Sequence, residues 1–213
     1  MHKKALIFGD SYSTFEGCVP DGYAIYYFSQ SCEYTDVREK EQTWWHRVMR
    51  RTGLELVQNN SWSGSTIGYT GYDNADNSAS SSFIFRLRQL IGNGFFEKNA
   101  IDTVFVFGGT NDSWSDAPLG EPKFENWEES DLYFVLPAVC YFLKCMKEAL
   151  PQAKIYCLVN TEIKTEITDC MKAACSRYGI TPVEFDHIDK NCGHPTIRGM
   201  QDIADRVLQT LTE

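Results

Sequence analysis

Four short blocks of the sequence contain the residue types that acyl transfer requires. A serine supplies a nucleophilic hydroxyl, a histidine can accept its proton, and glycine and asparagine N–H groups can bind an oxyanion. The four candidates are Ser11, Gly64, Asn111 and His194. They lie in "GDS" at 9–11, "NNSWSGST" at 59–66, "FGGTNDSW" at 107–114 and "DHIDKNCGHPTIRG" at 186–199. If the fold brings these blocks together, they predict catalysis by a serine nucleophile.

The elements between these blocks indicate how they could meet. Short apolar, β-rich runs alternate with segments of helical periodicity, and the runs lie at 4–8, 54–58, 103–107, 154–159 and 181–185. This alternation predicts an α/β fold with a parallel sheet covered by helices on both faces. Five strands favour a single-domain, flavodoxin-like three-layer sandwich over residues 1–213. Each block follows a predicted strand, so all four should lie at the carboxyl edge of the sheet, where ligands bind.

Helical periodicity is clearest in three segments. It spans 83–91, then 163–171 with Gly179 as the cap, and then the segment after Pro195. A longer helix over 132–150 must accommodate Pro137, either as a kink or by starting late. Two long segments, 12–41 and 112–130, do not fit the alternation and are expected to overhang the site.

Composition excludes several classes of partner. The chain has 213 residues, 43% hydrophobic, with a formal net charge of −9, which disfavours nucleic acids and anionic membrane surfaces. No apolar run approaches the roughly 18 residues that span a bilayer. The apolar run at 5–8 is too short for a signal peptide, so a cytoplasmic location is expected, although a leader already removed would leave the same start. The sequence does not indicate an oligomeric state.

No cofactor or metal is predicted. The chain has neither a Gly-x-Gly-x-x-Gly nor a Walker-type loop, and no His, Asp and Cys cluster has metal-ligand spacing. The eight cysteines have irregular spacings, and those on apolar helical segments are interpreted as reduced core thiols. Cys192 near His194 would allow a thiol enzyme, but this reading is weaker because Cys192 is expected to fill a loop.

The four blocks, in this order, resemble those of the SGNH (GDSL-type) esterase and lipase superfamily. The resemblance extends from residue 5 to residue 199. It implies that Ser11 is the nucleophile and His194 the base, followed by Pro195 as is usual in the family. It further implies an oxyanion hole formed by the Ser11 N–H, the Gly64 N–H and the Asn111 side chain.

Each candidate also has a simpler interpretation. Ser11 could cap a helix, Gly64 could serve a turn, Asn111 could bind its own backbone, and His194 could be only a capping residue. The four together, in order and at strand ends, favour the catalytic interpretation. Pro195 is a favoured first helical residue, so His194 is expected at a helix cap.

The acid behind His194 is the point of departure from the family. It usually precedes the histidine by three residues, and that position is Asn191 here. Asp189 is the first candidate for the triad acid, and Asp186 is the second. The third alternative is a Ser–His dyad oriented by a backbone carbonyl or by Asn191.

The sequence therefore predicts a serine esterase that forms an acyl-enzyme on Ser11. A small soluble ester, such as an acetylated carbohydrate, is the expected substrate, with Tyr12, Trp62 and Trp114 as its aromatic contacts. Two alternatives remain open. One is a lipase- or thioesterase-like acylhydrolase for longer acyl chains, and the other is a non-catalytic carbohydrate-binding module on the same fold.

Overall fold

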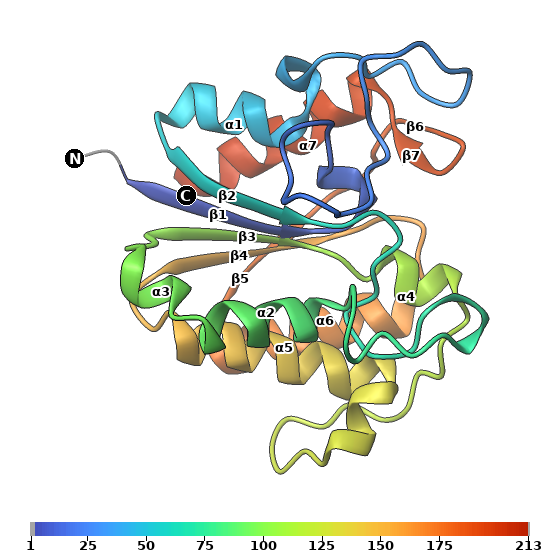
Figure 1. The fold of residues 1–213 in the computed structure, drawn as a ribbon, viewed down its shortest axis with the longest axis vertical. Helices are drawn as coiled ribbons and strands as arrows, with labels where there is room; N and C mark the ends of the chain where they lie inside the picture. Colours follow the sequence, from blue (N-terminus) through green and yellow to red (C-terminus); the bar gives the residue numbers. More distant parts are fainter. Residues whose placement is uncertain (1–2, 213) are drawn as a thin grey trace.

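A parallel sheet of five strands lies at the centre of the computed structural model, which describes residues 3–212 (Figure 1). The strand order is β2-β1-β3-β4-β5, and every neighbouring pair is parallel. The bounds are β1 Lys4–Gly9, β2 Glu55–Ser61, β3 Thr103–Phe107, β4 Lys154–Val159 and β5 Thr181–Glu184. This confirms the predicted flavodoxin-like, three-layer α/β fold.

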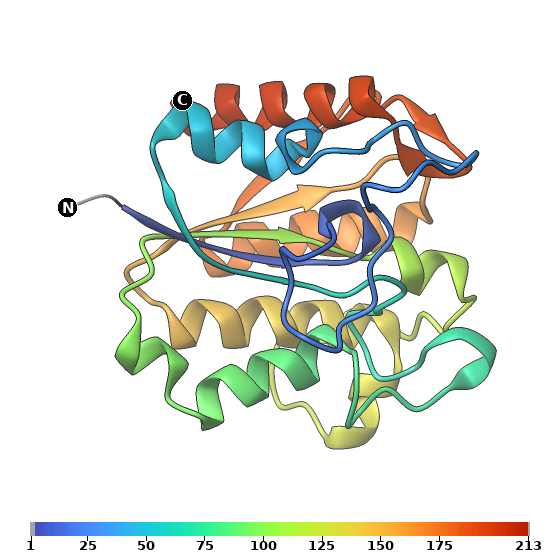
Figure 2. The same ribbon diagram turned by 45° about the horizontal axis from the view of Figure 1, so that its top comes forward.

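Two helical layers cover the sheet (Figures 1 and 2). One face carries α1 and α7, and the other carries α2, α5 and α6. The bounds are α1 Trp44–Thr52, α2 Phe83–Gly92, α5 Val135–Ala149, α6 Thr165–Tyr178 and α7 Ile197–Thr212. Two short helices, α3 (Phe95–Lys98) and α4 (Thr110–Trp114), flank β3 in the chain. Four 3-10 helices complete the set: η1 Ser11–Ser13, η2 Lys40–Gln42, η3 Tyr72–Asn74 and η4 Glu129–Tyr133.

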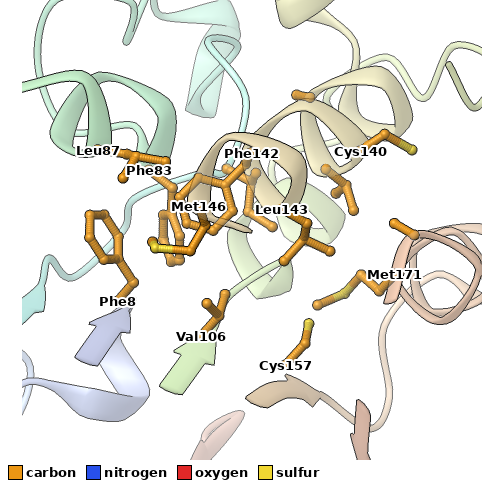
Figure 3. Packing of buried hydrophobic residues seen from close by; sticks show 14 of the residues in the cluster. Phe8, Phe83, Leu87, Val106, Cys140, Phe142, Leu143, Met146, Cys157 and Met171 are labelled. Carbon is orange, nitrogen blue, oxygen red and sulfur yellow. The ribbon is translucent and has the colours of Figure 1, made fainter. Parts of the chain in front are cut away.

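Alternating side chains of the strands enter two hydrophobic cores. In β1, Leu6 and Phe8 point into the core under α2, α5 and α6, whereas Ala5 and Ile7 point into the core under α1 and α7. Figure 3 shows the first core, where Phe8 and Val106 of the sheet meet Phe142 and other side chains of the helices. Both faces are buried, which explains why the strands read as almost continuously apolar.

The helix that contains Pro137 starts late and is not kinked by the proline, which decides between the two expectations. Helix α5 begins at Val135, so Pro137 lies in its first turn. Backbone N–H groups in the first turn have no partner within the helix, and the missing N–H of proline costs nothing there. Within residues 3–212, no helix is long and apolar enough to cross a membrane.

All eight cysteines are free thiols in the structure. Cys140, Cys157, Cys170 and Cys175 are buried, and the Sγ atoms of Cys140 and Cys170 lie 3.5 Å apart. They fill space between the helical layer and the sheet.

Candidate active site

Ser11 lies directly beyond the carboxyl end of β1, at the start of η1. The Asp10 side chain caps this turn, because its Oδ1 accepts a hydrogen bond from the Tyr12 amide at 3.0 Å. Gly9 is required by close packing, since a Cβ there would lie 2.5 Å from Ser61 Oγ and 2.6 Å from Ser13 Cβ. Burial raises the pKa of Asp10 to about 7, partly offset by the Tyr12 amide. The "GDS" block is therefore a tightly packed strand end that fixes the position of Ser11.

His194 meets Ser11 across the site. Its Nε2 lies 3.0 Å from Ser11 Oγ, and its Nδ1 lies 3.2 Å from the backbone carbonyl oxygen of Cys192. A carbonyl oxygen can only accept, so Nδ1 carries the proton of the neutral ring. Nε2 is then the unprotonated nitrogen and can accept the hydroxyl proton of Ser11. The geometry thus places a hydroxyl in contact with a nitrogen that can accept its proton.

The local structure around His194 differs from the expected helix cap. Strands β6 (Lys190–Asn191) and β7 (His194–Pro195) form a small antiparallel hairpin, and α7 begins only at Ile197. Its two turn residues, Cys192 and Gly193, have φ angles of 48° and 77°. Two positive φ angles are typical of the tight turns that suit a twisted hairpin. This turn directs the Cys192 carbonyl back to Nδ1.

No carboxylate contacts His194 in the described part of the chain. The Asp189 carboxylate accepts a hydrogen bond from the Thr196 hydroxyl, and its backbone oxygen accepts from the Thr196 amide at 3.0 Å. Asp186 is exposed, and the Asn191 side chain donates to the carbonyl of Tyr34 at 3.3 Å. In the structure the Asp189 carboxylate therefore contacts Thr196, and the hairpin turns His194 toward a backbone carbonyl.

Aromatic rings enclose the imidazole. The Tyr26 ring stacks on it with a centroid distance of 3.5 Å and an interplanar angle of 6°, and the Trp114 ring approaches edge-on at 5.6 Å. The hydroxyls of Tyr12 and Tyr27 donate to the carbonyls of Gly193 and Pro195, on either side of His194. Burial lowers the pKa of His194 to about 4, with the Cys192 carbonyl raising it and Lys190 lowering it further. Partial burial among aromatic rings therefore favours the neutral imidazole.

The three aromatic residues predicted to contact the substrate differ in how exposed they are. Tyr12 is fully buried, so an approach to substrate does not fit its position, and it supports the hairpin instead. Trp62 is partly exposed and packs against Tyr23 at a centroid distance of 4.3 Å. Trp114 is 39% exposed beside His194 and is the most accessible of the three.

The two long segments also differ. Segment 12–41 supplies Tyr26, which covers His194, as expected for a loop over the site. Segment 112–130 lies at the site only through its first residues. Trp127 packs against Tyr141 of α5, away from the sheet edge.

Gly64 and Asn111 are linked through Ser65, the residue that follows Gly64. The Asn111 Nδ2 donates to the Ser65 carbonyl at 3.0 Å, and the Tyr72 hydroxyl donates to Asn111 Oδ1 at 2.9 Å. Gly64 has a φ of 81°, which favours glycine, and the position of a Cβ there is open space. Among the described residues, the N–H groups of Ser11 and Gly64 have no acceptor. These N–H groups and the second N–H of Asn111 are available to an oxyanion.

Two buried charged residues support these donors. The Asp112 carboxylate accepts from the Ile67 amide at 2.9 and 3.0 Å and from the Gly68 amide at 3.3 Å. The Arg86 guanidinium is fully buried. Its acceptors are spread over the strand ends and loops: Gly9 O at 3.3 Å, Ser65 Oγ at 3.1 Å, Ser81 O at 2.8 Å and the carbonyl and side-chain oxygens of Asn60 at 2.5 and 2.6 Å.

Three residues of this arrangement are not predicted by the sequence: Tyr72, Arg86 and Asp112. Tyr26 is one of the aromatic residues of segment 12–41 that were expected over the site, but its stacking on His194 was not. A signal existed for Arg86, because it lies on the apolar stripe of its helix with Phe83 and Leu90, where a charge is unexpected. Asp112 directly follows Asn111, but the sequence places it in the irregular segment 112–130. In residues 3–212, no group of three or more His, Cys, Asp or Glu side chains could hold a metal ion.

Comparison with known proteins agrees with this architecture. The GDSL-like Lipase/Acylhydrolase family model matches residues 3–211. A provisionally assigned GDSL-like lipase from Bacteroides ovatus is 40% identical with a TM-score of 0.91, over 100% of this chain and 99% of that one. Its counterpart from Bacteroides uniformis is 41% identical with a TM-score of 0.90, over 99% and 96%. No curated protein sequence matches the chain.

A more distant structure shares the fold alone. An acetyl xylan esterase from Butyrivibrio proteoclasticus is 15% identical with a TM-score of 0.61, over 99% of this chain and 64% of that one. The match along almost the full length, together with the two Bacteroides structures, establishes the relationship. The chain belongs to the GDSL-like lipase/acylhydrolase family and is a hydrolase that acts on ester bonds.

Proposed function

We propose that this hydrolase is a serine esterase that cleaves small soluble carboxylic esters, such as acetylated carbohydrates, through an acyl-enzyme on Ser11. The observation that carries the proposal is the 3.0 Å contact between Ser11 Oγ and His194 Nε2, with Nδ1 bound to the Cys192 carbonyl. The second contact selects the tautomer in which Nε2 can take a proton.

The reaction follows from this geometry. Ser11 Oγ attacks the ester carbonyl carbon while its proton passes to His194 Nε2. The carbonyl electron pair becomes an oxyanion, which the N–H groups of Ser11 and Gly64 and the Asn111 amide stabilise. The intermediate collapses, and His194 returns the proton to the departing alkoxide. Water then attacks the acyl-enzyme with His194 as base, releasing the acid and restoring Ser11.

In this mechanism Ser11 and His194 form a dyad, and the Cys192 carbonyl orients His194 where a triad would use the carboxylate of an acid such as Asp189. A carbonyl holds the ring in the correct tautomer and orientation, as a carboxylate does. It carries no full charge, so the imidazolium formed during the reaction receives less electrostatic stabilisation. The π face of Tyr26, stacked on the ring at 3.5 Å, supplies part of this stabilisation.

Two observations support a carbohydrate ester. Trp114 and the Trp62–Tyr23 pair present aromatic surfaces beside the site, and such surfaces stack on sugar rings. The acetyl xylan esterase with the same fold also makes an acetylated sugar a reasonable first substrate to test.

Labelling with a fluorophosphonate probe tests the nucleophile. Wild type and the control Ser176→Ala, which alters an exposed serine of α6, should both be labelled, whereas Ser11→Ala should not. An unlabelled wild type, or labelling of Ser11→Ala at the wild-type rate, would contradict the proposal.

A series of nitrophenyl esters of increasing chain length, beside acetylated xylo-oligosaccharides, tests the substrate class. The proposal predicts the highest kcat/KM for acetyl esters. A preference for chains of eight or more carbons would instead support the longer-chain acylhydrolase. Binding of xylo-oligosaccharides with neither hydrolysis nor labelling would support the binding module.

A further inference from the structure

The Asn111 side chain is held at both ends of its amide. Its Nδ2 lies 3.0 Å from the Ser65 carbonyl oxygen, and its Oδ1 lies 2.9 Å from the Tyr72 hydroxyl. A backbone carbonyl only accepts hydrogen bonds, so the amide nitrogen must face Ser65. The amide oxygen then faces Tyr72, and the hydroxyl must be the donor. Asn111 is 3% exposed.

This arrangement leaves one N–H of Asn111 uncommitted. Of the two amide hydrogens, one binds the Ser65 carbonyl and the other is available to a substrate oxygen. The Tyr72 hydroxyl keeps the amide from rotating and polarises it, which makes the remaining N–H a better donor. Burial raises the pKa of Tyr72, which keeps the hydroxyl protonated and therefore able to donate.

The loop that presents Tyr72 is built for a fixed position. It lies beside α4 in Figures 1 and 2. The two residues after Tyr72, Asp73 and Asn74, have φ angles of 54° and 58°, in the left-handed region that Asp and Asn adopt more readily than other non-glycine residues. A β-bridge between Thr70 and Asp76 joins the two ends of this loop, and the Tyr133 hydroxyl donates to the Asp76 carboxylate at 3.3 Å.

We propose that Tyr72 is a positioning residue of the oxyanion hole: its hydroxyl orients the Asn111 amide so that one N–H points at the developing oxyanion. The role rests on the proposed function, in which Asn111 is an oxyanion donor. Tyr72 acts through Asn111 and takes no part in proton transfer. Its effect belongs to the transition state, so it changes kcat and leaves KM almost unchanged.

A double-mutant cycle tests this coupling. Tyr72→Phe removes only the hydroxyl and should lower kcat for nitrophenyl acetate about 3- to 10-fold, the loss of one hydrogen bond. Asn111→Ala should lower kcat on the order of 10²- to 10³-fold. In the Asn111→Ala background, Tyr72→Phe should cause no further loss beyond about twofold, because its partner is already absent.

The matched control is Tyr133→Phe, which removes the hydroxyl that holds the same loop at Asp76. It should keep kcat within about twofold of wild type. An equal loss in Tyr133→Phe and Tyr72→Phe would assign the effect to a loosened loop and overturn the proposal. An unchanged Tyr72→Phe would overturn it too, as would a loss of equal size in both Asn111 backgrounds. A fully active Asn111→Ala would instead contradict the oxyanion role on which the proposal rests.

Discussion

His194 and the proposed oxyanion donors lie at the same edge of the sheet, but different interactions hold them. On the base side, tyrosine rings and a backbone carbonyl contact the imidazole, and the positive charge of Lys190 lowers its pKa. On the oxyanion side, the buried Asp112 carboxylate accepts from the Ile67 amide, and the buried Arg86 guanidinium donates to the Ser65 hydroxyl and the Gly9 carbonyl. The difference follows from what each side must do. In the proposed mechanism the base needs an oriented ring that can gain and lose a proton, whereas an oxyanion hole must hold fixed donors in place throughout the reaction.

The largest expected effect comes from removing the charge of Arg86 on the oxyanion side. Arg86→Leu removes the donor shared by Gly9 O, Ser65 Oγ, Ser81 O and Asn60, and takes a hydrogen-bond partner from the buried Ser65 and Asn60 oxygens. We expect the free energy of unfolding to fall by about 3 kcal/mol or more, and turnover to fall with it. Urea unfolding followed by tryptophan fluorescence measures the change.

The matched control for that prediction is Arg51→Leu, because the Arg51 side chain is exposed and pairs with exposed Asp205 at 3.6 Å. Its free energy of unfolding should change by less than about 0.5 kcal/mol. A change below about 1 kcal/mol for Arg86→Leu would show that the buried guanidinium is not essential to this side.

Some of these features could be predicted from the sequence, and others could not. The strand order follows from the alternation of apolar runs and helices, and the parallel topology brings Ser11 and His194 to one edge. The hairpin around Cys192 was missed because its turn residues, Cys-Gly, are an uncommon choice for two positive φ angles. The contribution of Tyr26 and Tyr72 was not predictable from periodicity, because both lie in irregular segments positioned by tertiary contacts.

The pH profile of kcat/KM probes the base side. His194 must be neutral to accept a proton, and burial lowers its pKa to about 4. Activity should therefore rise through about pH 4 and be constant from about pH 5 to neutrality. An acidic limb near 6.5, the ordinary histidine pKa, would show that burial does not lower the pKa of His194.

Folding must be checked by circular dichroism at each pH of that profile. The unfolded chain protonates its histidine near 6.5, whereas the folded chain does so only near 4. His194 therefore lowers stability as the pH falls through this interval. Activity lost together with the circular dichroism signal reports unfolding and not the base.

Removing the Tyr26 ring from the imidazole of His194 should have a smaller effect on kcat, and it tests the base side alone. Tyr26→Phe keeps a ring over the imidazole and should retain kcat within about twofold. Tyr26→Leu removes the π face and should lower kcat about 5- to 10-fold, as expected for loss of a cation–π contact with the imidazolium. The control is Tyr34→Leu, whose ring is 39% exposed and contacts Tyr26 at a centroid distance of 5.4 Å. Equal losses in Tyr26→Leu and Tyr34→Leu would contradict a specific role for the stack.

The turnover of Asp189→Asn tests most directly whether the base works without a carboxylate. The substitution keeps an acceptor for the Thr196 hydroxyl, so the fold around the hairpin should persist. With the Cys192 carbonyl orienting His194, kcat should stay within about threefold of wild type. A loss approaching about 10⁴, the cost of the same exchange in a Ser-His-Asp triad, would contradict this account and make Asp189 the acid.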